Sequence, residues 1–362
     1  MLGGGGLKGI AHIGVLRALE ERRIRPALIA GTSIGSLIGT AYAGGASLFD
    51  MEERAVALKR RDLFRLNRVG MIRQRQLALS IYLEEPLREL CNAIVPHVPL
   101  GELPIPTLVN TVDLQQGAQL VWGLPGLQNV PATDAVYASC ALPGFFPPGM
   151  VGDRICADGG VIDNLPVAIA AQGMDAVIAV DVGSSVIQRR EDILGSGFAS
   201  IYMHAASTMM HALQLAPLIR WQRPPMLLVR PRISHVAWFS FDHADELIQA
   251  GYDAASEALD AYDACLDEPA GVFPRQPVNL SVDPDKCIGC TLCVALAPDT
   301  MAMGDDGKAF PLTPVVEWSP VDGDFVHHCP TLAISAERVA PDRTPSLEAT
   351  QADAIEVPLD SG

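Results

Sequence analysis

The sequence is poor in basic residues: 26 lysines and arginines stand against 42 aspartates and glutamates, a formal net charge of −16. Nucleic-acid-binding proteins need a basic surface that displaces counterions from phosphates, so this balance argues against general nucleic-acid binding. Only 19% of the residues are charged and 49% are hydrophobic, which excludes disorder of the whole chain. A length of 362 residues predicts about two domains.

The sequence also lacks the marks of export. Its start, Met-Leu-Gly-Gly-Gly-Gly, has neither the basic segment nor the apolar core of a signal peptide. Eight cysteines are too sparse for a small disulfide-bonded scaffold. One uncharged stretch, residues 27–49, is long enough to span a bilayer, but its glycines, serines and threonines favour a buried strand, turn and helix. We therefore predict a cytoplasmic protein without a transmembrane helix.

Residues 1–265 alternate between short apolar runs and helical patterns, which is typical of a largely parallel sheet covered by helices. The predicted strands are 27–30, 107–110, 120–122, 177–182 and 226–229, and the clearest helices are 10–22 and 242–262. Residues 266–278 hold proline and acids without periodicity and predict a linker. A compact cysteine-bearing module is predicted at 279–340 and an acidic disordered tail at 341–362.

Basic residues gather between Arg54 and Arg75, where eight of them accompany a single acid, Asp62. One interpretation is the solvated face of a helical insertion. The other is a cationic lip that makes transient contact with lipid head groups at a membrane surface. The sequence alone favours the solvated face, although the cluster is an exception in so acidic a chain.

A glycine loop opens the chain. Gly4, Gly6 and Gly9 fit the pattern G-x-G-x-x-G, but the dinucleotide-binding fingerprint needs a preceding strand, and only Met1 and Leu2 come before the glycines. Unobstructed backbone N–H groups near a helix start also form a cradle for an anion, including the oxyanion of an ester under attack. NAD binding at this loop stays open as an alternative.

The segment Gly31-Thr32-Ser33-Ile34-Gly35 fits G-x-S-x-G directly after an apolar run. Gly31 and Gly35 permit the sharp strand-to-helix turn that lifts the hydroxyl of Ser33 out of a sheet, as in a nucleophile elbow. The alternative is a tight turn with an N-cap serine. A nucleophilic serine needs a base. None of the eight histidines lies in an obvious late strand-end loop, and we interpret His12 as structural.

Asp158 is the better candidate base. It ends a short predicted strand and begins Asp158-Gly159-Gly160, so no bulky neighbour prevents the carboxylate from approaching a hydroxyl. A carboxylate with an ordinary pKa of about 4 is a weak base, but burial raises its proton affinity. The alternative is a turn aspartate that caps its own backbone.

Taken together and in this order, these motifs resemble those of a bacterial patatin-like phospholipase over about residues 1–262. The resemblance is carried by the glycine loop with Lys8, Gly9 and His12, by the serine elbow, by Asp158 with Gly159 and Gly160, and by stretches 138–144, 163–167 and 241–255. It implies an α/β fold of three layers, α/β/α, with a largely parallel sheet. In this family a full strand precedes the glycines, and its loss would loosen the loop.

The resemblance also implies the chemistry. Ser33 would be the nucleophile and Asp158 the proton acceptor of a Ser–Asp dyad. The backbone N–H groups of Gly4, Gly5 and Gly6 would form the oxyanion hole, and the substrate would be an acyl ester of a lipid or lysolipid.

A second motif follows near the C-terminus. Cys287, Cys290 and Cys293 form C-x2-C-x2-C, the run that holds ferredoxin-type clusters, and Cys329, which precedes Pro330, would be the fourth ligand. The segment resembles a single-cluster bacterial ferredoxin over roughly residues 279–339, which implies a small α+β domain with one 4Fe–4S cluster. Zinc or a 3Fe–4S cluster are the alternatives.

Two functions are therefore open. The first is a serine lipid acyl hydrolase that carries a redox module. The second is an electron-transfer or redox-regulatory protein whose N-terminal domain only binds lipid. In either case a redox partner protein could exchange electrons with the cluster.

Overall fold

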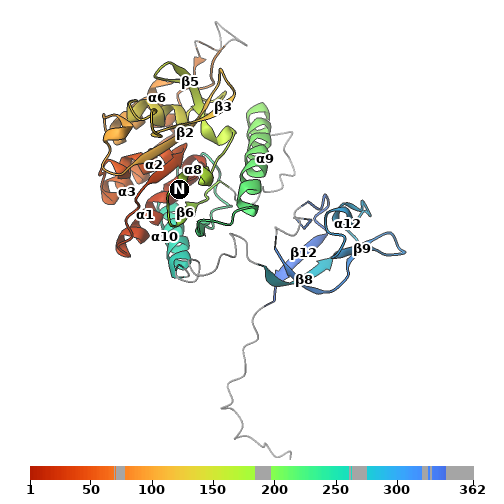
Figure 1. Cartoon of the computed structure of the whole chain (residues 1–362). Coiled ribbons are helices and arrows are strands. Elements are labelled where there is room, and N and C mark those ends of the chain that lie inside the picture. Colours follow the sequence, from red (N-terminus) through yellow and green to blue (C-terminus); the bar gives the residue numbers. More distant parts are fainter. Residues whose placement is uncertain are drawn as a thin grey trace, which may run out of the picture. The chain divides into compact units, whose positions relative to one another are not determined.

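The computed structural model describes residues 1–68, 70, 78–183, 197–260, 262, 275–319, 325–326 and 328–339 (Figure 1). The chain divides into two compact units, Met1–Val272 and Phe273–Gly362. The predicted tail at 341–362 and most of the predicted linker lie outside the described residues. The linker was predicted to extend too far, because the first strand of the second unit begins at Gln276.

The first unit holds seven strands and nine α-helices among its described residues. The strands are β1 (Ile29–Thr32), β2 (Thr107–Asp113), β3 (Ala118–Trp122), β4 (Gly149–Val151), β5 (Arg154–Asp158), β6 (Val177–Val180) and β7 (Met226–Val229). The helices are α1 (Ala11–Glu21), α2 (Ile34–Ala43), α3 (Leu48–Ala57), α4 (Arg60–Leu63), α6 (Glu85–Ile94), α7 (Ala132–Cys140), α8 (Val167–Ala170), α9 (Gly197–Ile219) and α10 (Ala244–Asp260). Short 3-10 helices are η1 (Gly6–Ile10), η3 (Leu100–Glu102) and η4 (Gly159–Val161).

The sheet is parallel at its centre and antiparallel on one side. β1 pairs with β2 and β6 pairs with β7 in parallel, whereas β2 pairs antiparallel with β3 and β5, and β5 with β4. Leu2 forms parallel bridges with both Gly31 and Val180. The residues before the glycine loop thus join β1 to β6, the position in which the resemblance implies a full strand.

Helices cover both faces of the sheet. Val109 of β2 belongs to the large core under α1, α2, α7 and α10, whereas its neighbour Leu108 belongs to a smaller cluster with Ala170 of α8. Successive residues of a strand point to opposite faces, so the two clusters mark two helical layers. This confirms the predicted mixed α/β architecture.

The uncharged stretch 27–49 contains β1, α2 and the start of α3, as predicted. Among the described residues, no helix is both long and apolar enough to cross a membrane.

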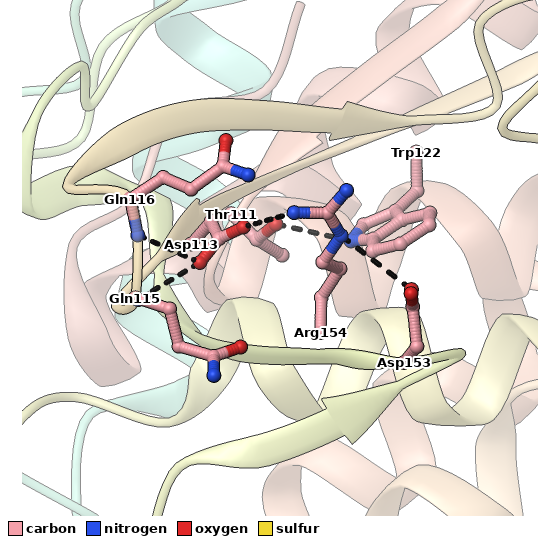
Figure 2. Close-up of polar contacts among 7 residues, drawn as sticks. All are labelled: Thr111, Asp113, Gln115, Gln116, Trp122, Asp153 and Arg154. Atoms are coloured by element: carbon pink, nitrogen blue, oxygen red, sulfur yellow. Dashed lines mark hydrogen bonds and ion pairs between the residues drawn. The ribbon is translucent and has the colours of Figure 1, made fainter.

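A polar network ties the two hairpins of the antiparallel side together (Figure 2). The carboxylate of Asp113 accepts hydrogen bonds from the backbone N–H of Gln115 at 2.8 Å and of Gln116 at 3.1 Å, and from Arg154 at 3.2 Å. Burial alone would raise the pKa of Asp113, but these contacts lower it below its ordinary value. Because Arg154 begins β5 and Asp158 ends it, the network helps to fix the register of the strand that carries the predicted base.

The second unit has its own small core. β8 (Gln276–Val282) pairs antiparallel with β11 (Val315–Trp318) and β12 (Ile334–Arg338), and β9 (Met301–Met303) pairs antiparallel with β10 (Ala309–Pro311). The described helix is α12 (Leu292–Leu296). Two of the predicted ligands, Cys287 and Cys293, belong to the buried core itself.

Candidate active site

Ser33 stands at the sharp turn between β1 and α2 in a strained backbone conformation. Its φ is 54° and its ψ is −128°, a region that residues other than glycine rarely adopt. The N–H of Ser33 donates to the hydroxyl of Ser139 at 2.9 Å, and that hydroxyl donates to the carbonyl of Asn110 at 2.7 Å. The carbonyl of Ser33 accepts from the hydroxyl of Ser36 at 2.6 Å. Neighbouring elements therefore hold the turn in the geometry of a nucleophile elbow.

Asp158 lies at the end of β5 and lines the same cavity as this serine. The residue is 3% exposed, and its carboxylate accepts the N–H of Gly160 at 2.9 Å. Burial raises the pKa of Asp158 to about 6, although the hydrogen bonds from Ser33 and Gly160 favour the charged form. A buried carboxylate in contact with a hydroxyl, with a raised pKa, has the properties of a general base.

The glycine loop is held from two sides. His12 donates from Nε2 to the carbonyl of Gly3 at 2.8 Å, and Asn164 donates from Nδ2 to the carbonyl of Gly4 at 2.9 Å. Burial lowers the pKa of His12 to about 4, so its ring is neutral at neutral pH and serves as a fixed donor. A Cβ at Gly4 would lie 2.3 Å from Oδ1 of Asn164, so only glycine allows this close contact.

The three glycines predicted to form the oxyanion hole differ in what their N–H groups do. The N–H of Gly4 already donates to the backbone carbonyl of Asn164 at 3.2 Å. The N–H groups of Gly5 and Gly6 have no acceptor within the described part of the chain. Gly6 also lines the cavity beside Ser33. Among the described residues, the glycine-loop donors without an acceptor are therefore those of Gly5 and Gly6.

The remaining motif residues pack around the turn. Lys8 is buried in η1, and burial lowers its pKa to about 8. Side chains at the motif glycines would collide with neighbouring atoms of the site, which explains why glycine occupies these positions: Gly9, Gly31, Gly35, Gly159 and Gly160.

An apolar cavity opens beside the serine and the aspartate. Ser33 and Asp158 line it together with hydrophobic side chains from η1, α1, α2, α3, α4 and α6. Among the described lining residues, the charged ones are Asp158 and Arg54. Representative hydrophobic members are Ile10, Leu37, Ile38, Leu87, Leu90 and Phe146. The cavity suits an aliphatic chain whose polar end meets the hydroxyl of Ser33.

The sequence interpretation missed three residues of this site. Asn110, Ser139 and Asn164 make the contacts that position the elbow and the loop, but none had been assigned a role. Ser139 and Asn164 lie inside stretches 138–144 and 163–167, which had been noted for their family resemblance only. That resemblance was the available signal.

In the second unit, all four predicted cysteine ligands line one cavity. Cys287 and Cys293 are buried, Cys329 is partly buried and Cys290 is exposed. Backbone N–H groups approach two of the sulfurs, Ala309 to Cys287 at 3.4 Å and Ala333 to Cys329 at 3.3 Å. Burial would raise the pKa of Cys329, but hydrogen bonds from the backbone and from Thr331 lower it.

The loop that carries the three closely spaced cysteines needs glycine at one position. Gly289 has a φ of +69°, and a Cβ there would lie 2.4 Å from the carbonyl oxygen of Gly307. Among the described residues, no three ligands converge on a single-ion centre. Four thiols around one cavity, with N–H groups directed at the sulfurs, fit an iron–sulfur cluster, whose cysteines bind different irons.

Comparison with protein families gives two matches. Residues 1–171 match the family model described as patatin-like phospholipase, and residues 282–317 match the model described as the 4Fe-4S single cluster domain of Ferredoxin I. The second match includes Cys287, Cys290 and Cys293 and ends before Cys329.

Curated relatives match between half and three quarters of the chain. An uncharacterized NTE family protein, Rv1063c of Mycobacterium tuberculosis, is 37% identical over 185 residues, which are 51% of this chain and 48% of the relative. Lysophospholipase NTE1 of Mycosarcoma maydis is 29% identical over 75% of this chain and 15% of the relative. Patatin-like phospholipase domain-containing protein 6 of Mus musculus is 34% identical over 51% of this chain and 13% of the relative. The chain thus spans about half the length, or less, of the curated relatives it matches.

Among solved structures, VipD from Legionella pneumophila matches with a TM-score of 0.40 and 14% identity, over 71% of this chain and 66% of that chain. Similarity at this level supports no statement about function.

Proposed function

From a chain that carries a patatin-like domain at its N-terminus and a single-cluster 4Fe–4S domain near its C-terminus, we propose a serine-dependent lipid acyl hydrolase with a redox module. The observation that carries the proposal is that Ser33, at its strained turn, and the buried carboxylate of Asp158 line the same apolar cavity. Relatives named as lysophospholipases support a lipid or lysolipid ester as the substrate. We place the protein in the cytoplasm.

In the acylation step, Asp158 accepts the proton of the Ser33 hydroxyl while Oγ forms a bond to the acyl carbonyl carbon. The strained turn presents Oγ at the mouth of the cavity, so little rearrangement is needed before attack. The ester C–O bond then breaks, and Asp158 returns the proton to the leaving alcohol. An acyl chain bound to Ser33 remains in the apolar cavity.

Negative charge develops on the carbonyl oxygen during this step. The N–H groups of Gly5 and Gly6 are the proposed donors to that oxygen, each worth about 3 kcal/mol of barrier. Gly4, whose N–H is engaged by Asn164, contributes through its carbonyl, which Asn164 holds. If either N–H group pointed away from the carbonyl oxygen, the negative charge on that oxygen would be less stabilised.

Deacylation uses the same groups. Asp158 takes a proton from a water molecule, and the resulting hydroxide attacks the acyl carbon. Oγ of Ser33 leaves with the proton that Asp158 gives back, and the free fatty acid departs.

In the C-terminal unit, Cys287, Cys290, Cys293 and Cys329 are the proposed ligands of one 4Fe–4S cluster. When bound, such a cluster accepts or donates one electron. The cysteines would hold it in their shared cavity, where the N–H groups of Ala309 and Ala333 lie 3.4 Å and 3.3 Å from the sulfurs of Cys287 and Cys329. A redox partner protein would approach on the side of the exposed Cys290.

The alternative is an electron-transfer or regulatory protein whose N-terminal domain binds lipid without cleaving it. Labelling of Ser33 by a fluorophosphonate separates the two, because the reagent needs an activated serine. If the labelling rate changes when the cluster is reduced, the redox state of the cluster affects the active site. If the cluster is intact but Ser33 is not labelled, the result favours the alternative.

Hydrolysis of p-nitrophenyl butyrate by site variants tests the dyad. Ser33→Ala and Asp158→Asn should each lose at least about a thousandfold in rate. Ser47→Ala, at the exposed N-cap of α3, and Asp153→Asn, whose side chain is 92% exposed, are matched controls and should keep full activity. Full activity in Ser33→Ala or Asp158→Asn would remove that residue from the mechanism.

A further inference from the structure

The basic residues that follow Arg54 lie on the described surface rather than in the core. They are divided between the end of α3, α4 and the segment 64–68. Exposed members are Arg54, Lys59, Arg60, Arg61, Arg65 and Arg68. The acid in this stretch is Asp62, which pairs loosely with Arg61 at 3.7 Å. Arg73 and Arg75 lie outside the described residues.

Large hydrophobic side chains are exposed within this segment and on the chain paired with it. Val56 is 51% exposed, Leu66 48% and Leu79 71%. Single exposed hydrophobic residues are common, but three of them with six basic residues form an amphipathic surface. We call the six basic and three apolar residues together the rim.

One rim residue, Arg54, lines the cavity that contains Ser33, together with Leu58, Leu63 and Phe64 of the same segment. The guanidinium of a second, Arg60, lies over the ring of Phe64, 5.6 Å from its centre. The rim is therefore continuous with one wall of the cavity.

Part of the rim has a defined backbone. Leu66 forms an antiparallel bridge with Tyr82, and the N–H of Asn67 donates to the carbonyl of Ile81 at 2.9 Å. Behind this ribbon, Phe64, Tyr82 and Phe146 pack against one another with ring centres 4.7 to 5.8 Å apart. The rim is thus presented on a packed support rather than on an isolated loop.

We propose that the rim docks the protein on bilayers that contain anionic phospholipids, so that an acyl ester passes from the bilayer into the cavity. This deepens the proposed function and rests on it. Cations attract anionic head groups, and apolar side chains between them insert at the head-group boundary. A nucleic acid would use the cations but not Val56, Leu66 and Leu79. The anionic bilayer repels the strongly acidic remainder of the chain. This repulsion favours the orientation in which the rim faces the bilayer.

Vesicle binding tests the proposal without requiring catalysis. The Ser33→Ala protein is mixed with vesicles of phosphatidylcholine alone or of phosphatidylcholine with phosphatidylglycerol, and the bound fraction is measured by sedimentation. Binding should be confined to the anionic vesicles and should weaken with salt. In the Ser33→Ala background, the triple variant Arg61→Gln, Arg65→Gln, Arg68→Gln should bind anionic vesicles on the order of a hundredfold more weakly. This factor follows because each cation contributes about fivefold to the affinity.

The control removes equal charge elsewhere. Arg25→Gln, Arg220→Gln, Arg232→Gln changes three exposed arginines outside the rim and should bind anionic vesicles as the Ser33→Ala protein does. A second variant, Leu66→Gln with Leu79→Gln, should weaken binding even in high salt, because it removes the apolar contribution. Circular dichroism checks that each variant is folded.

Equal binding to neutral vesicles, or an equal loss in both triple variants, would overturn the proposal. In an otherwise wild-type chain, the rim triple variant should hydrolyse dissolved p-nitrophenyl butyrate at the normal rate and vesicle lipids more slowly. If the wild-type chain does not hydrolyse the dissolved ester, the proposed hydrolase function is contradicted. This result differs from a failure of vesicle binding, which contradicts only the docking proposal.

Discussion

The side-chain nitrogen of Asn164 lies 2.9 Å from the carbonyl oxygen of Gly4, across 160 positions of sequence. That carbonyl and the N–H of Gly5 belong to one planar peptide group and point in opposite directions. Holding the oxygen therefore orients the N–H. Gln214 of α9 accepts a second hydrogen bond from the same side-chain nitrogen at 3.1 Å. Asn164 thus positions one of the proposed oxyanion donors without touching the substrate.

Asn164→Asp should lower kcat for p-nitrophenyl butyrate by about ten- to hundredfold with little change in KM. A carboxylate cannot donate to the Gly4 carbonyl, so the Gly4–Gly5 peptide loses its fixed orientation. The loss should be smaller than the hundred- to thousandfold expected when an oxyanion donor itself is removed. Steady-state kinetics on folded protein give the split between kcat and KM.

The matched control for that substitution is Gln214→Met, which removes the other partner of the Asn164 amide but leaves its bond to Gly4. Its kcat should stay within about threefold of wild type, because only the hydrogen bond between Asn164 and Gln214 is lost. If both variants lose activity equally, or if Asn164→Asp changes KM alone, Asn164 does not orient the loop.

The rate should depend on pH through Asp158. Only the ionised carboxylate accepts the serine proton, and burial raises its pKa to about 6. The value of kcat/KM should therefore be constant above pH 6 and fall about tenfold for each pH unit below it. An exposed aspartate would place this decline near pH 4. Initial rates with a neutral soluble ester between pH 4 and 7 distinguish the two.

The same raised pKa predicts that the site reduces the stability of the fold. An acid with a folded pKa of about 6 and an unfolded pKa of 3.8 binds more protons when folded between these pH values, so stability falls as pH rises through that range. Asp158→Asn removes the buried charge and should raise the free energy of unfolding at pH 8 by about 2–3 kcal/mol. Denaturant unfolding at pH 8 and pH 4 measures it, and the gain should vanish at pH 4.

Much of this architecture could be predicted from local patterns. The alternation of apolar runs and helical segments predicted β1, β2, β6 and β7, because a buried parallel strand needs a short apolar run. The segment around Ser33 predicted its own sharp turn, because the glycines at 31 and 35 are adjacent to it in sequence. Where neighbouring residues in the sequence determine an element, the predicted and observed elements agree.

The contacts that position the site could not be predicted in the same way. Ser139 reaches the N–H of Ser33 across 106 residues, and Asn164 reaches Gly4 across 160. A buried serine or asparagine carries no periodic signal, so its partner appears only when the chain is folded. The engaged N–H of Gly4 is another such case, since four glycines in a row look alike in the sequence.

The exposure of the rim was equally hidden. The eight basic residues favour a solvated face, because the sequence does not show which of the apolar residues between them stay exposed. The bridge between Leu66 and Tyr82 brings the segment that holds Leu79 beside the basic segment, and this pairing is not visible in the sequence.

Removal of iron should unfold the C-terminal unit and leave the N-terminal unit folded. The core of the second unit is small, and Cys287 and Cys293 are members of it, so loss of the cluster removes both cross-links and packing. Small domains of this kind depend on metal ligation for stability. The N-terminal unit has a much larger core, and none of the four proposed cluster ligands belongs to it.

Hydrogen exchange measured by mass spectrometry resolves the two units within one sample. After treatment with a strong iron chelator and a reductant, peptides from β8 and β12 should lose protection, whereas peptides from β2 and β5 should keep it. Cys329→Ala should show the same pattern without a chelator and carry fewer than the four irons expected per chain, while Cys156→Ala, in the N-terminal unit, should keep the full complement. Stoichiometric zinc in place of iron, or full protection of β8 and β12 after iron removal, would contradict a 4Fe–4S cluster that holds this unit together.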